Sequence, residues 1–205
     1  MPTNFQKALR EGKYNRVRVL CGFNQDEASR FVQEPTVEQY TSFVDHVFGD
    51  KAQEVKDRFP VNEDNVRERS QDLVRSCFCL SGLKMMADKM SHDGLGVYAY
   101  NFRFCPQVIA NNPLGVTRVT ETPFIFNQSP ETIYNDPQAG QVSQDMHKYW
   151  VNFIKNGTPN LKGMPTWMRY TPDGQNFMTF EGTSSLQPVP NFDDINFIVE
   201  RMKEL

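Results

Sequence analysis

The chain has 205 residues, a length that suits one domain or a large piece of a bigger one. Its 22 Lys and Arg residues against 25 Asp and Glu give a formal charge of -3 without a basic cluster, which argues against nucleic-acid binding. It contains no run of about 18 apolar residues, so no transmembrane helix is predicted.

The first third of the chain predicts a strand followed by helices. Residues 16–23, "RVRVLCGF", are rich in Val and Leu and read as a buried strand, after which comes a polar turn. Thr36 is a candidate helix N-cap with Gln39 at the reciprocal capping-box position, and apolar residues keep helical spacing over 37–48. A short helix is predicted over 50–59, where a proline stops it.

The rest of the chain continues the alternation of helix and strand. The longest periodic stretch predicts a helix over about 65–90, and alternation with aromatic residues predicts a strand over 97–104. A helix over 141–155, a late strand over 175–182 and an amphipathic helix over 193–205 follow. This order belongs to the α/β class, and only about three strands are expected, which suggests part of a larger sheet.

Four cysteines, Cys21, Cys77, Cys79 and Cys105, are too few for a disulfide framework in a chain of this length. Cys77 and Cys79 are too close in sequence for the usual zinc spacing and lack a second pair, so no metal site is predicted. We therefore expect buried free thiols. The N-terminal residues have no apolar segment of the kind found in signal peptides.

Five segments match one family in the same order along the chain. They resemble motifs of the type B carboxylesterases, the family that includes cholinesterases and fungal esterase/lipases. The segments are "VLCGFNQDEASRF", "GVYAYNFRF", "LGVTRVTETPFIFN", "YWVNFIKNGTPN" and "TWMRYTPDG". The resemblance covers nearly the whole chain and implies an α/β-hydrolase fold with a Ser-Glu-His triad.

The resemblance implies that Glu27 occupies the position of the triad acid. It lies in the turn that follows the first predicted strand, where a carboxylate can stand at the carboxyl edge of the sheet and orient an imidazole. A lone Glu in a polar turn would otherwise be expected to face solvent.

The position of the catalytic histidine falls on Arg118, three residues before Glu121 and 91 residues after Glu27. A guanidinium has a pKa above about 12, so it cannot accept a proton from a serine at neutral pH. His46, His92 and His147 lie outside the matching motifs, and we expect them on the surface or on helix faces.

The nucleophile elbow of the family, Gly-x-Ser-x-Gly, occurs nowhere in the 205 residues, and neither does a glycine-rich oxyanion loop. Because the family carries both upstream of the acid, residues 1–205 are expected to be the C-terminal portion of a carboxylesterase domain. This reading implies a hydrolase ancestry, an acyl-serine reaction without metal or organic cofactor, and no turnover by this chain alone.

Two other interpretations stay open. In the first, the chain is a non-catalytic, cholinesterase-like binding module that has lost the histidine. In the second, it is an unrelated small α/β domain in which Arg118 is a surface charge that can pair with Glu121.

The expected partners differ accordingly. The parent enzyme would take a small-molecule ester, and the open sheet edge would be covered by the missing N-terminal half or by another protein. Many members of the family are secreted or luminal, but the sequence itself gives no compartment.

Overall fold

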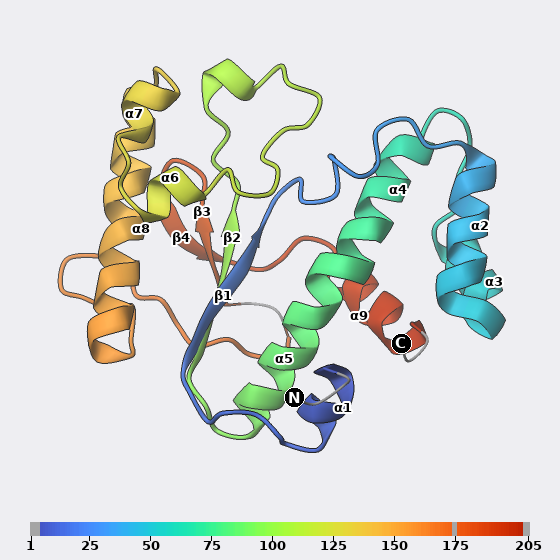
Figure 1. Ribbon diagram of the computed structural model, residues 1–205, viewed down its shortest axis with the longest axis horizontal. Helices are drawn as coiled ribbons and strands as arrows, with labels where there is room; N and C mark the ends of the chain where they lie inside the picture. The colour runs from blue at the N-terminus through green and yellow to red at the C-terminus, as the bar shows by residue number, and fades with distance from the viewer. Residues whose placement is uncertain (1–4, 174–175, 203–205) are drawn as a thin grey trace.

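The computed structural model describes residues 5–173 and 176–202, which form one mixed four-stranded sheet with helices packed on both of its faces (Figure 1). The strands, in spatial order, are β1 (Val19–Asn24), β2 (Val97–Phe102), β3 (Phe177–Phe180) and β4 (Ser184–Gln187). The first three run parallel, and β4 runs antiparallel to β3. The α/β prediction is confirmed, and β4 is a strand that the sequence patterns missed.

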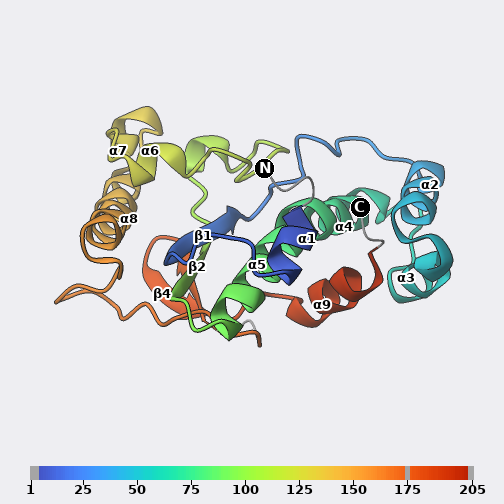
Figure 2. The same cartoon turned by 60° about the horizontal axis from the view of Figure 1, so that its bottom comes forward.

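Alternating residues of β2 supply the cores on the two faces, as the period of a strand requires. Tyr98, Tyr100 and Phe102 belong to an aromatic cluster with buried Trp167, whereas Ala99 belongs to the cluster on the other face. The helices of the aromatic face are α6 (Thr122–Ile125), α7 (Pro130–Ile133) and α8 (Pro137–Asn156). On the other face lies α5 (Ser81–His92), against which α1 (Phe5–Arg10) packs (Figure 2).

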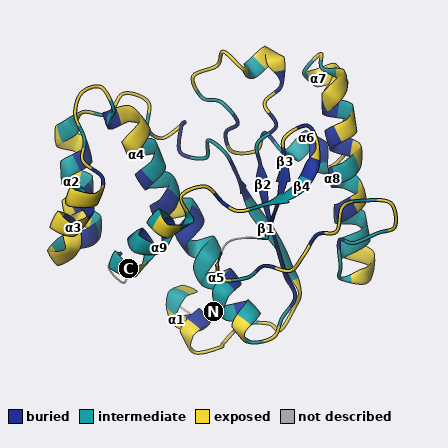
Figure 3. Cartoon of the chain, turned by 180° about the vertical axis from the view of Figure 1, so that it is seen from behind, coloured by how far each residue is buried: buried dark blue, intermediate teal, exposed yellow. Residues whose placement is uncertain are grey.

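A helical lobe extends beyond the sheet on the side of α5 and has an apolar cluster of its own (Figure 3). It is made of α2 (Val37–Phe48), the 3₁₀ turn η1 (Gly49–Lys51), α3 (Ala52–Arg58), α4 (Val66–Arg75) and α9 (Phe192–Arg201). One helix ties the lobe to the sheet, because in α9 Ile195 packs in the cluster under the sheet and Ile198 in the cluster of the lobe.

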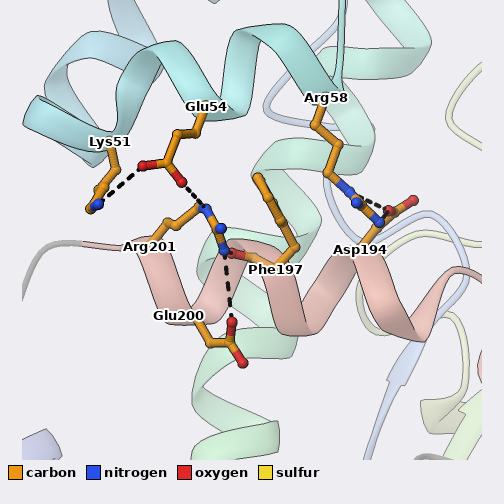
Figure 4. Close-up of polar contacts among 7 residues, drawn as sticks. All are labelled: Lys51, Glu54, Arg58, Asp194, Phe197, Glu200 and Arg201. Atoms are coloured by element: carbon orange, nitrogen blue, oxygen red, sulfur yellow. Dashed lines mark hydrogen bonds and ion pairs between the residues drawn. The ribbon is translucent and has the colours of Figure 1, made fainter.

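Polar contacts fix α9 against α3 (Figure 4). Arg58 donates from Nε and Nη2 to Asp194 Oδ1 at 2.9 and 2.6 Å, and Arg201 Nε donates to Glu54 Oε2 at 2.8 Å. The ring of Phe197 lies between the two guanidinium groups, 4.7 Å from Arg58 and 3.6 Å from Arg201. The two helices are therefore joined by ion pairs and cation–π contacts together.

The predicted helix over 65–90 is confirmed with one addition. Between α4 and α5 the chain forms a π-helical turn, η2 (Ser76–Leu80), which carries Cys77 and Cys79. Such turns insert a wider hydrogen-bonded loop into a helix and occur often at functional sites. Here the turn continues one long rod rather than ending it, as Figure 1 shows.

Most other predicted elements are confirmed with shifted ends. The Thr36 capping box is present and begins α2, and α8 starts at Pro137, four residues earlier than predicted, with Asp136 as N-cap. β1 begins at Val19 rather than at 16. The last residues of the predicted terminal helix and the first residue of the predicted late strand lie outside the described residues. Helix α1 was not predicted.

The four cysteines are free thiols, as expected, but only Cys77 is fully buried, and Cys105 is exposed. The expectation of burial is wrong for Cys105, which follows β2 at the start of a surface loop. No helix in the described part of the chain has the length and apolarity to cross a membrane.

Candidate functional site

The turn after β1 and the loop after β2 are joined at the carboxyl edge of the sheet. Asp26 N–H donates to Val116 C=O at 3.0 Å, and Val116 N–H donates to Asp26 Oδ2 at 2.8 Å. Gly115 is required beside this pair, since its φ is +60° and a Cβ there would lie 2.3 Å from Asp26 Oδ2. Ser29 Oγ extends the junction by donating to Leu114 C=O. The two segments that carry Glu27 and Arg118 are thus held side by side.

Glu27 is half-buried in this turn, not fully exposed as a lone polar-turn residue would be. Its Oε1 accepts a hydrogen bond from the backbone N–H of Asn24 at 3.1 Å, so the carboxylate folds back over the end of β1. Burial raises the pKa of Glu27, and the Asn24 N–H opposes that rise; the charge of Glu121 adds to it, and the charge of Arg118 reduces it. The charges of Glu121 and Arg118 therefore act on the carboxylate of Glu27 in opposite directions.

Asn24 connects the two carboxylates. Its side chain is only 1% exposed, and Nδ2 donates both to Thr117 C=O at 2.8 Å and to Glu121 Oε2. Its backbone N–H holds Glu27, so one residue at the end of β1 positions Glu27 and Glu121 together. The buried Oδ1 of Asn24 has no hydrogen-bond partner among the described residues.

Arg118 is exposed, and it makes no ion pair with any carboxylate of the described residues within 4.0 Å. The pairing with Glu121 that an unrelated α/β domain would allow is not formed among the described residues, and Glu121 accepts a hydrogen bond from Asn24. The next residue, Val119, has φ +68°, a left-handed conformation that β-branched residues avoid. Arg118 therefore precedes a residue of unusual backbone conformation.

A thiol faces the same region from the π-helical turn. Burial raises the pKa of Cys79, Glu27 adds to the rise, and Arg118 and Arg75 oppose it. The sequence analysis did not single out Cys79 for this site, and its position follows only from the path of the long helix. With a raised pKa, this thiol is protonated at neutral pH and is a poor nucleophile.

The three histidines do not reach this edge. His46 and His92 are exposed, and Nδ1 of His147 lies 3.0 Å from Ile125 C=O on the aromatic face, as expected for helix and surface histidines. Across the described residues, no three His, Cys, Asp or Glu side chains group so that they could hold a metal ion. The edge therefore offers a carboxylate that can orient a base and a guanidinium that can bind an anion.

Comparison with known proteins gives one consistent result. Residues 1–197 match the profile of the family described as "Carboxylesterase family". Fumonisin B1 esterase of Sphingopyxis macrogoltabida is 24% identical over 186 residues, which cover 84% of this chain and 34% of that protein. Liver carboxylesterase B-1 of Rattus norvegicus is 22% identical over 203 residues, with coverage of 83% and 34%.

Solved structures agree at the level of the fold. A thermophilic PNB esterase superposes with a TM-score of 0.77 at 19% identity, over 94% of this chain and 40% of that one. A second PNB esterase structure gives a TM-score of 0.76 over 94% of this chain and 40% of that one. The chain spans about a third of the length of the curated relatives it matches and two fifths of the solved structures.

Proposed function

Because the chain belongs to the carboxylesterase family, we propose that it supplies the acid-bearing part of an ester-hydrolysing α/β-hydrolase domain, with Glu27 as the triad acid. The observation that carries this proposal is the link through Asn24, which holds Glu27 through its backbone and Glu121 through its side chain. A carboxylate fixed in this way at the end of a strand is the group that orients a catalytic imidazole.

The parent reaction needs three further parts. A serine hydroxyl attacks the ester carbonyl, an imidazole takes the proton of that hydroxyl, and backbone N–H groups stabilise the oxyanion. Arg118 stands at the position of the imidazole and keeps its own proton, so it cannot perform the second role. The motif that supplies the serine is absent from the sequence. We propose that the 205-residue chain does not turn over esters by itself.

The partner that fits this role is a polypeptide segment carrying the nucleophile. β1 pairs only with β2 among the described residues, so its other edge is free to accept a parallel strand. A segment bound there would place the carboxyl end of its strand beside Glu27. The ester would be a small molecule bound between the two parts.

The test is hydrolysis of p-nitrophenyl acetate by the purified chain and by Arg118→His. We expect neither protein to exceed the background rate, because histidine alone does not provide a nucleophile. Turnover by Arg118→His that is blocked by a serine-directed organophosphate would overturn the proposal. Unchanged circular dichroism of the variant is the control for folding.

A second candidate function is a non-catalytic binding module, and the exposed guanidinium of Arg118, which forms no ion pair with the described carboxylates, favours it. In that case, selection maintains the surface and not the triad. The two functions separate when a segment carrying the nucleophile is added to Arg118→His. Restored turnover supports the acid-bearing part of an esterase, and binding without turnover supports the module.

A further inference from the structure

Among the described residues, no strand pairs with the edge of β1 that faces away from β2. Val19 N–H donates to Gly96 C=O and Gln25 N–H donates to Phe102 C=O, both at 2.9 Å, so odd-numbered residues of this strand face β2. By the period of two, the N–H and C=O groups of Leu20, Gly22 and Asn24 face the open edge. In Figure 1, β1 runs along the front of the sheet with no helix drawn across it.

One of these outward groups already has a partner. The N–H of Asn24 donates to the carboxylate of Glu27, so the end of the edge is closed by the side chain of the acid. Leu20 and Gly22 are half-buried and keep their outward N–H and C=O groups for another strand. The available edge is therefore short and centred on residue 21.

The charges along β1 are separated by sign. Arg16 and Arg18 precede the strand, and Asp26 and Glu27 follow it. A second copy of β1 in parallel orientation would place like charges together. A second copy in antiparallel orientation places the arginines of each chain beside the carboxylates of the other, which is the favourable cross-strand arrangement.

We propose that the 205-residue chain forms a two-fold dimer by antiparallel pairing of β1 with β1 of a second copy. In the register with Cys21 on the two-fold axis, Leu20 and Gly22 of the second copy form the hydrogen-bonded pair, and the ladder ends there because the Asn24 N–H donates to Glu27. Arg16 then stands opposite Asp26 of the second copy. The contact is isologous and closes on itself, so it yields a dimer and not a filament.

This dimer goes beyond the proposed function and competes with it for one edge. A complementing segment and a second copy cannot both pair with β1. The esterase assay on the chain alone needs no dimer, and the mass measurement needs no ester, so either result can fail without the other.

The first experiment is light scattering on the reduced chain over roughly a hundredfold dilution. We expect twice the chain mass of 23.7 kDa at high concentration, falling toward one chain on dilution. A monomer at every concentration, or open-ended larger oligomers, would overturn the proposal.

The second experiment locates the interface by cysteine cross-linking. One variant keeps only Cys21 and its matched control keeps only Cys105, with the other cysteines replaced by Ser or Ala. Residues directly opposite each other in a non-hydrogen-bonded antiparallel pair have Cα atoms about 4.5 Å apart, within disulfide range. Copper–phenanthroline oxidation should cross-link the Cys21 chain and spare the Cys105 chain, although Cys105 is more exposed. Equal cross-linking of the two variants, or none at Cys21, would contradict the register.

A third variant removes one pairing group. Leu20→Pro deletes an N–H that points away from β2, so the bonds between β1 and β2 remain. We expect a monomer with the circular dichroism of the unmodified chain, and a folded dimer would contradict the proposal. If this variant does not fold, the cross-linking of Cys21 still tests whether two copies pair through β1.

Discussion

At the scale of single residues, the backbone at Val119 is the most unusual feature of the candidate site. Its φ of +68° places a β-branched residue in the left-handed region, beside an arginine that makes no ion pair with the described carboxylates. Its side chain is 61% exposed and contributes little to any core. The backbone strain at this position is therefore not offset by burial of the same residue.

Val119→Gly is expected to stabilise the chain by about 1 kcal/mol. Relief of left-handed strain gains about 1–2 kcal/mol, and the greater freedom of glycine in the unfolded state removes part of that gain. Urea denaturation measures the change. Val108→Gly is the matched control, since Val108 is 65% exposed without a positive φ and should lose stability. If both variants lose the same free energy of unfolding, the backbone at Val119 is not strained.

Glu27 gives a prediction that depends on pH. Its pKa is raised above the ordinary 4.5, mainly by burial, so ionising it costs more in the folded chain than in the unfolded one. Below the ordinary pKa of 4.5, Glu27 is protonated in both states and does not lower the stability of the fold. As the pH rises through the raised pKa of the folded chain, the free energy of unfolding decreases. Glu27→Gln should therefore unfold at a higher temperature than the unmodified chain at pH 7, and the difference should vanish in acid.

The control for this titration is Glu34→Gln, which removes an exposed carboxylate from a loop. It should leave the melting temperature unchanged at both pH values, because surface changes of this kind stay within about 0.5 kcal/mol. If Glu27→Gln melts lower at pH 7, the hydrogen bond from Asn24 N–H outweighs the cost of burial.

The sequence motifs predict two candidate positions of the site, Glu27 and Arg118, but not the contacts around them. Glu27 and Arg118 follow from short motifs, and their placement on adjoining segments agrees with the expected edge of the sheet. Asn24 and Cys79 could not be found in this way. Asn24 donates to Thr117, 93 residues further along the chain, a contact that no local pattern predicts. An asparagine at the end of a strand is also an ordinary turn residue.

At the scale of elements, α9 carries a contact whose strength can be measured. Phe197 lies between Arg58 and Arg201 and has an edge contact with Phe59. Phe197→Leu keeps an apolar side chain but removes both cation–π contacts, each worth about 0.5–1 kcal/mol. We expect a loss of about 1–2 kcal/mol in the free energy of unfolding, measured in urea.

Phe126→Leu is the matched control, because Phe126 is 65% exposed and makes no ring contact with the described residues that would be lost. Its effect should stay within about 0.5 kcal/mol. An equally small effect at Phe197 would mean that solvent screens the two guanidinium groups from the ring.

Elements with strong local signals were predictable, and short ones were not. The capping box fixes the start of α2, and aromatic alternation identifies β2. The strand β4 has the sequence "SSLQ", with no β-branched or aromatic residue, and it forms because the chain turns back beside β3. Helix α1 has six residues and is ordered by its packing on α5, which local sequence does not encode.

At the scale of the whole molecule, three apolar clusters are expected to melt together. Both tryptophans lie in or against the aromatic cluster of the sheet, so tryptophan fluorescence reports that cluster. Far-ultraviolet ellipticity reports the helices, including those of the lobe. Since α9 joins the cluster under the sheet to that of the lobe, both signals should share one transition temperature. Two separated transitions would show that the lobe unfolds independently.

The parallel pairing of β1 has a consequence for synthesis. Val19 pairs with Val97 and Ala99 with Phe177, so each parallel pair joins positions 78 residues apart (97 − 19 and 177 − 99), whereas β3 and β4 meet across a short hairpin. On a ribosome that adds about 5–20 residues per second, β1 waits roughly 4–16 s for β2 to be made. Throughout that interval the edge of β1 that later pairs with β2 is exposed, and a chaperone that shields extended apolar segments can bind there.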